Sequence, residues 1–188
     1  MRRARRNWRR QQPSWDPARL IFLDESSAKT NLTRLRGRAA RGQRVHGSAP
    51  HGHWHNTTVI GALRLDGTTA CLALEGATDT EVFTTYVTQV LRPLLKPGDV
   101  VVMDNLAAHK SAPILALLRQ AGAEPLFLPA YSPDFNPIEK MWSKIKQILR
   151  SLEARTQPAL LAAIGQALAA VTPQDALNWF ASCGYNFI

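Results

Sequence analysis

Short apolar runs separated by turn residues mark the first part of the chain. Residues 20–23 are all apolar and are followed by Asp24, which predicts a buried strand with an acid at its carboxyl end. Two further apolar runs, at 57–65 and 69–75, are joined by an Asp-Gly pair that is typical of a β-hairpin turn. The three runs together predict a meander of three strands.

Helical periodicity begins near residue 80 and then alternates with short strand-like runs. Helices are predicted over residues 80–91, 112–121, 138–152, 157–170 and 174–182, and strands over residues 100–103 and 124–129. A meander followed by alternating helices and strands predicts an α/β domain built on a mixed sheet.

The chain is strongly basic, and part of its positive charge is concentrated at the N-terminus. The 188 residues carry a formal net charge of +9 and a pI of about 10.3, which predicts a polyanionic partner. Nucleic acid, an anionic membrane surface and an acidic protein all remain candidates at this point. Residues 1–19 contain seven arginines and one acid, so we expect a basic leader or linker ahead of a single domain at 20–188.

A second basic segment, residues 29–55, has no acid and is interrupted by glycines, which predicts an exposed loop or hairpin excursion. We expect its arginines to contact DNA phosphates or a partner subunit, chiefly Arg36, Arg38, Arg41 and Arg44. The PHGHWH tract at 50–55 has two interpretations. Its alternating histidines could bind zinc, or the tract is a polar loop with Trp54 packed against the body.

Cysteine and hydropathy patterns bear on the compartment. Cys71 and Cys183 are far apart and outside any CxxC pattern, so we interpret both as reduced thiols. No apolar stretch reaches the length of a membrane span. We therefore expect no membrane partner and a cytoplasmic location.

Three acids stand where an α/β fold places ligands. Asp24 and Asp104 each follow a run of four apolar residues, and Glu139 opens the helix after the last strand. Each acid alone has another interpretation. Asp24 and Asp104 could belong to turns, and Glu139 could form a capping box with Asn136. Taken together, three converging carboxylates supply the oxygen ligands that two Mg²⁺ ions need.

The predicted helix at 138–152 offers an independent check. Its apolar positions form one stripe, which we expect to face the core: Ile138, Met141, Trp142, Ile145, Ile148, Leu149 and Leu152. Lys146 and Arg150 lie within about 20° of Glu139 on the helical wheel. A carboxylate in line with two cations suits a surface that binds DNA beside a cleavage site. The alternative is a solvated polar face.

Three tracts carry a resemblance to a known family. They are LDES at 23–26, VVMDNLAAH at 101–109 and LPAYSPDFNPIEKMWSKIK at 128–146. They resemble the DDE endonuclease domain of mariner-like transposases, in the bacterial insertion-sequence branch. The 34 residues between Asp104 and Glu139 fit the spacing of that group.

The resemblance implies an RNase H-like fold, with a mixed five-stranded sheet flanked by helices. It also implies cut-and-paste DNA transposition that depends on two Mg²⁺ or Mn²⁺ ions held by Asp24, Asp104 and Glu139. His109, five residues after Asp104, is expected either to contact a phosphate or to open the following helix.

The expected partner is double-stranded DNA, both transposon ends and target, bound by a homodimer in the bacterial cytoplasm near the nucleoid. Relatives carry a helix-turn-helix at the N-terminus, whereas residues 1–19 are too short for one and lack an apolar face. We therefore expect an upstream helix-turn-helix polypeptide as a further partner. Two alternatives remain: an RNase H-like nuclease without strand transfer, and a catalytically inactive DNA-binding protein.

Overall fold

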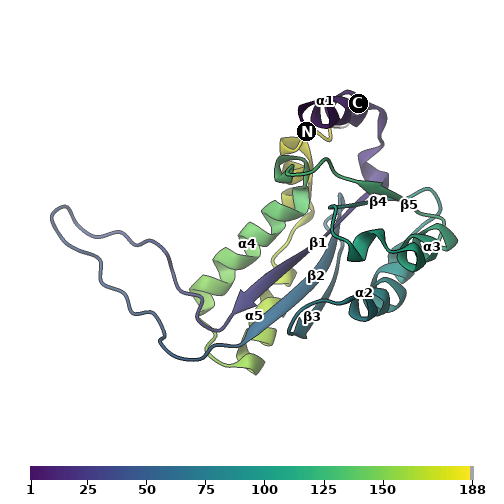
Figure 1. Ribbon diagram of the computed structural model, residues 1–188. Helices are drawn as coiled ribbons and strands as arrows, with labels where there is room; N and C mark the ends of the chain where they lie inside the picture. The colour runs from purple at the N-terminus through teal and green to yellow at the C-terminus, as the bar shows by residue number, and fades with distance from the viewer. Residues whose placement is uncertain (187–188) are drawn as a thin grey trace.

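The computed structural model describes residues 1–186, which are built around one five-stranded sheet (Figure 1). The strand order is β3-β2-β1-β4-β5. The strands are β1 (Leu20–Lys29), β2 (Asn56–Arg64), β3 (Thr69–Glu75), β4 (Val100–Met103) and β5 (Glu124–Phe127). The first three pair antiparallel, whereas β4 runs parallel to both β1 and β5. The mixed sheet and the meander predicted from the sequence are confirmed.

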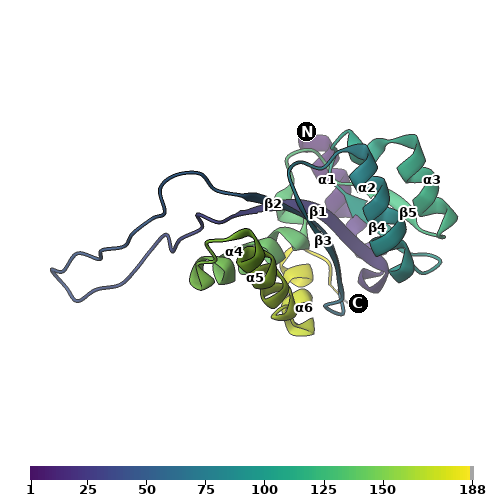
Figure 2. The same cartoon turned by 90° about the horizontal axis from the view of Figure 1, so that it is seen from below.

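Helices cover both faces of the sheet (Figures 1 and 2). They are α1 (Arg2–Gln11), α2 (Thr80–Tyr86), α3 (Ala112–Gln120), α4 (Pro137–Leu152), α5 (Gln157–Ala169) and α6 (Pro173–Ser182). Helices α2 and α3 lie on one face and α4, α5 and α6 on the other. A π-helical stretch, Val87–Leu91, continues α2. None of the helices within residues 1–186 combines the length and apolar character that a bilayer span requires.

The alternation of side chains along β1 explains how the two layers are separated. Leu20 and Phe22 pack into the core beneath α4, α5 and α6, whereas Ile21 and Leu23 pack beneath α2 and α3. Successive side chains on a strand point to opposite faces. Asp24, two residues after Phe22, is therefore directed to the α4 face.

Strand β1 is longer than the sequence indicated. It continues through Lys29 because its polar second half pairs antiparallel with β2. The expectation that Asp24 ends the strand is therefore wrong, since it lies in the middle of β1 opposite Gly61. Its parallel neighbour β4 pairs only with residues 20–22, so Asp24 still lies just past the edge of the parallel half of the sheet.

Helix α4 buries most of the predicted apolar stripe. Five of the seven side chains in the stripe are buried, and Ile148 is half-buried. Leu152 is 39% exposed, so the prediction that it faces the core is wrong. Gly61 of β2 lets α4 approach closely, since a Cβ there would lie 2.6 Å from the indole of Trp142. This contact fixes α4 across the sheet directly beside Asp24.

The segment between β1 and β2 projects from the body as a long loop (Figures 1 and 2). A hydrogen bond from the N–H of Thr30 to the carbonyl of His55 closes its base. Residues 34–56 are all exposed, and no strand forms within 30–55. The segment is therefore an exposed loop, and the alternative of a hairpin is wrong. Trp54 is 50% exposed, so the expectation that it packs against the body is wrong.

The N-terminal segment forms the helix α1, and it packs against the domain that begins at residue 20. Trp8 is only 5% exposed and belongs to the same core as Phe22 and Phe180. Trp8, the one buried side chain of α1, therefore anchors the basic segment to the domain. Residues 187–188, at the predicted end of the 20–188 domain, lie outside the described residues.

Candidate active site

The two aspartates of the site come from adjacent parallel strands. Phe22 of β1 pairs with Val102 of β4, and Asp24 and Asp104 each lie two residues further along. Strand alternation directs Asp24 to the α4 side of the sheet, whereas Asp104 follows the last residue of β4 and its carboxylate contacts His109. The register of this pairing brings together two acids that are 80 positions apart in sequence.

Glu139 reaches the same place from the first turn of α4. All three acids line one open pocket of about 520 Å³, which residues 128–133 also line. The structure therefore brings the three carboxylates to one pocket, although Asp24 lies within β1 and not at its end.

Asn136 occupies the N-cap position of α4, as the sequence predicted, but it does not form the capping box of the alternative interpretation. It precedes α4, yet its side chain makes no capping hydrogen bond. Its amide Nδ2 instead donates to Oδ2 of Asp24 at 3.3 Å. The side chain of Asn136 thus helps to hold an acid of the pocket, and Glu139 is free to face solvent.

The electrostatic environment of Asp24 is unfavourable for a bare carboxylate. Burial raises the pKa of Asp24, and although the backbone N–H of Glu25 lowers it, the carboxylates of Glu139 and Asp104 raise it further, to about 7. A bound cation would have the opposite effect, because it stabilises the ionised form.

His109 lies behind Asp104. Its side chain is fully buried, and its Nδ1 lies 2.7 Å from Oδ1 of Asp104 while its Nε2 lies 3.7 Å from Oε1 of Glu25. Burial lowers the pKa of His109, but the two carboxylates outweigh this and raise it to about 9. Neither expected role applies, because the buried ring is not accessible to a phosphate and α3 begins only at Ala112.

The donor set of the pocket suits hard divalent cations. Carboxylate oxygens are the ligands that Mg²⁺ prefers, and His109 beside Asp104 offsets only part of the repulsion that Asp104 and Glu139 exert on Asp24. Within residues 1–186, no three His, Cys, Asp or Glu side chains already surround a single point at metal-binding distance. Asp104 is directed towards His109 and the N–H of Leu106, so the acids line the pocket without closing on its centre.

The basic residues expected to bind DNA fall into two groups. Arg36, Arg38, Arg41 and Arg44 are exposed on the loop that projects from the body (Figure 1), and none of them lines the pocket of the acids. Lys146 and Arg150 lie on α4, about two and three turns beyond Glu139. Lys146 borders a separate small cavity with Ser26 and Ser27, so neither cation lines the pocket of the acids.

The supporting residues Asn136, His109 and Glu25 were not identified from the sequence as partners of the acids. Asn136 was recognised, but as a cap, because its local context is Asn-Pro-Ile-Glu. His109 had a signal in its closeness to Asp104, although its burial could not be seen. Glu25 directly follows Asp24 and offered no signal of its own.

Comparison with family models gives one match. Residues 19–161 match the model described as DDE superfamily endonuclease. No curated protein matches the sequence.

Solved structures similar to this chain include several of Mos1. The mariner Mos1 paired end complex with Mg has a TM-score of 0.78 at 17% identity. The match covers 97% of this chain and 58% of the Mos1 chain. The Mos1 strand transfer complex has a TM-score of 0.76 at 16% identity, covering 96% and 56%. The Mos1 mariner transposase catalytic domain has a TM-score of 0.67 at 15% identity, covering 98% and 95%. The shared architecture is the expected RNase H-like fold. In the two complexes, this chain spans less than two thirds of the Mos1 chain.

Proposed function

The chain belongs to the DDE superfamily of endonucleases, and we propose on this basis that it is the catalytic domain of a DNA transposase. It would cleave DNA strands at transposon ends and join them to target DNA by metal-dependent phosphoryl transfer. The observation that carries the proposal is the pocket lined by Asp24, Asp104 and Glu139.

The three acids would hold two Mg²⁺ or Mn²⁺ ions. Asp24 supports this assignment because burial and the neighbouring carboxylates raise its pKa to about 7, and divalent cations would stabilise its ionised form. When bound, the ions would activate the attacking water or DNA 3′-hydroxyl and stabilise the leaving oxygen. No side chain then needs to act as the general base.

The protein's own groups would orient the acids. Asn136 donates to one oxygen of Asp24, and the Glu25 N–H donates to the other. His109 holds Asp104 from the buried side, leaving the second oxygen of Asp104 for the pocket. Partners of this kind fix the orientation of metal ligands and raise their effectiveness.

DNA is the polyanion that fits these features. We assign the backbone contacts to the loop arginines Arg36, Arg38, Arg41 and Arg44 and to Lys146 and Arg150 on α4. The name of one similar structure describes a Mos1 transposase paired-end complex with the left transposon end, which agrees with this choice. A homodimer on DNA and a helix-turn-helix partner are part of the same proposal.

Strand transfer is tested with a pre-cleaved duplex bearing a free 3′-hydroxyl, incubated with target plasmid and Mg²⁺ or Mn²⁺. This substrate bypasses recognition of the transposon end. We expect joined products that disappear with EDTA. Metal-dependent hydrolysis without joining would make the protein a nuclease, and an absence of both products would make it an inactive DNA-binding protein. Either result would overturn the proposal.

A further inference from the structure

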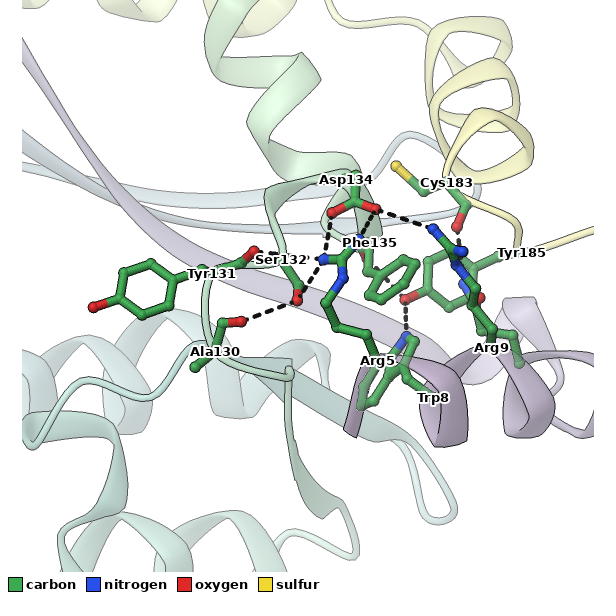
Figure 3. Close-up of polar contacts among 11 residues, drawn as sticks. Arg5, Trp8, Arg9, Ala130, Tyr131, Ser132, Asp134, Phe135, Cys183 and Tyr185 are labelled. Atoms are coloured by element: carbon green, nitrogen blue, oxygen red, sulfur yellow. Dashed lines mark hydrogen bonds and ion pairs between the residues drawn. The ribbon is translucent and has the colours of Figure 1, made fainter. Parts of the chain in front are cut away.

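Helix α1 is held rigidly against the body along one side (Figure 3). The indole Nε1 of Trp8 donates to the hydroxyl of Tyr185 at 3.0 Å, and its ring packs edge-on against Trp15. One residue beyond the helix, Gln12 Nε2 donates to the carbonyl of Cys183 at 2.8 Å. These contacts connect the N-terminal helix to the C-terminal segment of the chain.

Arg5 fixes α1 to the wall of the catalytic pocket (Figure 3). Its guanidinium donates to both carboxylate oxygens of Asp134, at 2.8 and 2.7 Å, and to the hydroxyl of Ser132 at 2.8 Å. It also lies over the ring of Phe135, 4.7 Å from the centroid. Since Ser132 lines the pocket of the three acids, α1 lies at the rim of that pocket.

The outer side of α1 carries a stripe of three arginines. At 100° per residue, Arg3, Arg6 and Arg10 fall within an arc of about 60°, roughly opposite the buried Trp8. All three are exposed. In the described part of the chain, no acid pairs with any of them, because Asp134 interacts only with Arg5 and Arg9.

This charge pattern does not stabilise the isolated helix. The first turn of α1 holds arginines and no acid, so its charges oppose the helix dipole and repel one another. The helix is therefore held by Trp8, Gln12 and Arg5. A polyanion along the outer side would remove the repulsion.

We propose that Arg3, Arg6 and Arg10 bind the phosphate backbone of duplex DNA directly beside the catalytic pocket. The proposal rests on the proposed function, since it places the DNA substrate. Ten residues of helix are about 15 Å long, which corresponds to roughly four base-pair steps. Helix α1 would thus contact the stretch next to the scissile phosphate, and Arg5 would keep this contact in register with the pocket.

The test compares two triple variants of the full chain with the same loss of charge. One is Arg3→Gln/Arg6→Gln/Arg10→Gln. The control is Arg92→Gln/Lys96→Gln/Arg119→Gln, whose three cations are exposed on the α2–α3 side of the sheet. Binding to a random 30-base-pair duplex is measured from 50 to 300 mM salt without divalent metal. We expect the α1 variant to bind about tenfold more weakly and to lose two to three units of the log–log salt slope. The control should stay within threefold of wild type.

A third variant, Arg3→Lys/Arg6→Lys/Arg10→Lys, checks that substitution at these positions does not itself disturb the fold. It keeps the charges and should retain most of the affinity for DNA. Equal affinities of the two glutamine variants would overturn the proposal. So would a selective loss of binding to phosphatidylserine vesicles in the α1 variant, which would assign the stripe to a membrane.

Position is tested by attaching iron-EDTA through the thiol of Arg6→Cys. On a pre-cleaved end we expect backbone cuts within about five base pairs of the reactive 3′-hydroxyl. Cuts scattered along the duplex would contradict the placement. Neither the binding measurement nor the mapping needs catalysis. A chain that does not join DNA would therefore still bind DNA through Arg3, Arg6 and Arg10 if the α1 proposal is right. Conversely, if the wild-type chain joins DNA and the α1 variant binds DNA as tightly as wild type, the α1 contact is refuted and the proposed function stands.

Discussion

The Nδ1 of His109 lies 2.7 Å from Oδ1 of Asp104, with the imidazole fully buried. The contact fixes the direction of a proposed metal ligand from a position that no substrate can reach. On the other side of the ring, Glu25 faces Nε2 at 3.7 Å. His109 thus bridges Asp104 and Glu25, the residue next to Asp24, from a buried position.

Replacing His109 tests this positioning role. His109→Leu should fold, because the ring packs against Phe83, and should reduce strand cleavage by about 10- to 100-fold. His109→Asn keeps an N–H near the position of Nδ1 and should lose less. DNA affinity without metal should not change in either variant. Cleavage by His109→Leu at the wild-type rate would contradict the role.

Asn136 should affect activity more than stability. Since its side chain does not cap α4, Asn136→Ala should lower cleavage about tenfold and raise the Mg²⁺ concentration needed, with little change in the free energy of unfolding. The matched control is Thr172→Ala, which removes the capping box of α6. It should cost about 1 kcal/mol of stability and leave cleavage intact. The reverse pattern would make Asn136 an ordinary cap.

Trp8 tests whether α1 belongs to the folded body. Trp8→Ala should lower the free energy of unfolding by about 3 kcal/mol or more, because it removes a buried ring and leaves Tyr185 without its donor. Trp8→Phe keeps most of the packing and should cost less. Chemical denaturation of both variants measures the difference. A solvated leader would give no change in either.

The loop arginines are tested together. Changing Arg36, Arg38, Arg41 and Arg44 to Ala should weaken binding to random and transposon-end duplexes alike, and lower the log–log salt slope by roughly three to four units. Competition binding at several salt concentrations provides both values. A loss for only one sequence would indicate base readout instead, and an unchanged slope would indicate a contact between subunits.

Local periodicity predicted the strands, the helices from residue 80 onwards and most of the apolar side of α4, because each depends on neighbours within a few turns, but it did not predict α1. It could not predict features that depend on distant partners. The polar half of β1 is a strand only because β2 pairs with it. Trp8 is buried by Tyr185, 177 positions away, and Asn136 is directed to Asp24 rather than to its own helix. The three acids were found because their positions in the pattern and their spacing agreed.

The central claim is that Asp24, Asp104 and Glu139 form a metal-dependent catalytic site, and Glu139 tests it best because a helix-capping role was its strongest alternative. Glu139→Gln keeps the side-chain size and removes one charged ligand. The measurement is the Mg²⁺-dependent cleavage rate of Glu139→Gln beside Glu81→Gln, a control in the first turn of α2. We predict a loss of roughly a thousandfold or more for Glu139→Gln, with DNA binding retained, and no loss for the control. Cleavage by Glu139→Gln within a factor of a few of wild type would contradict the account.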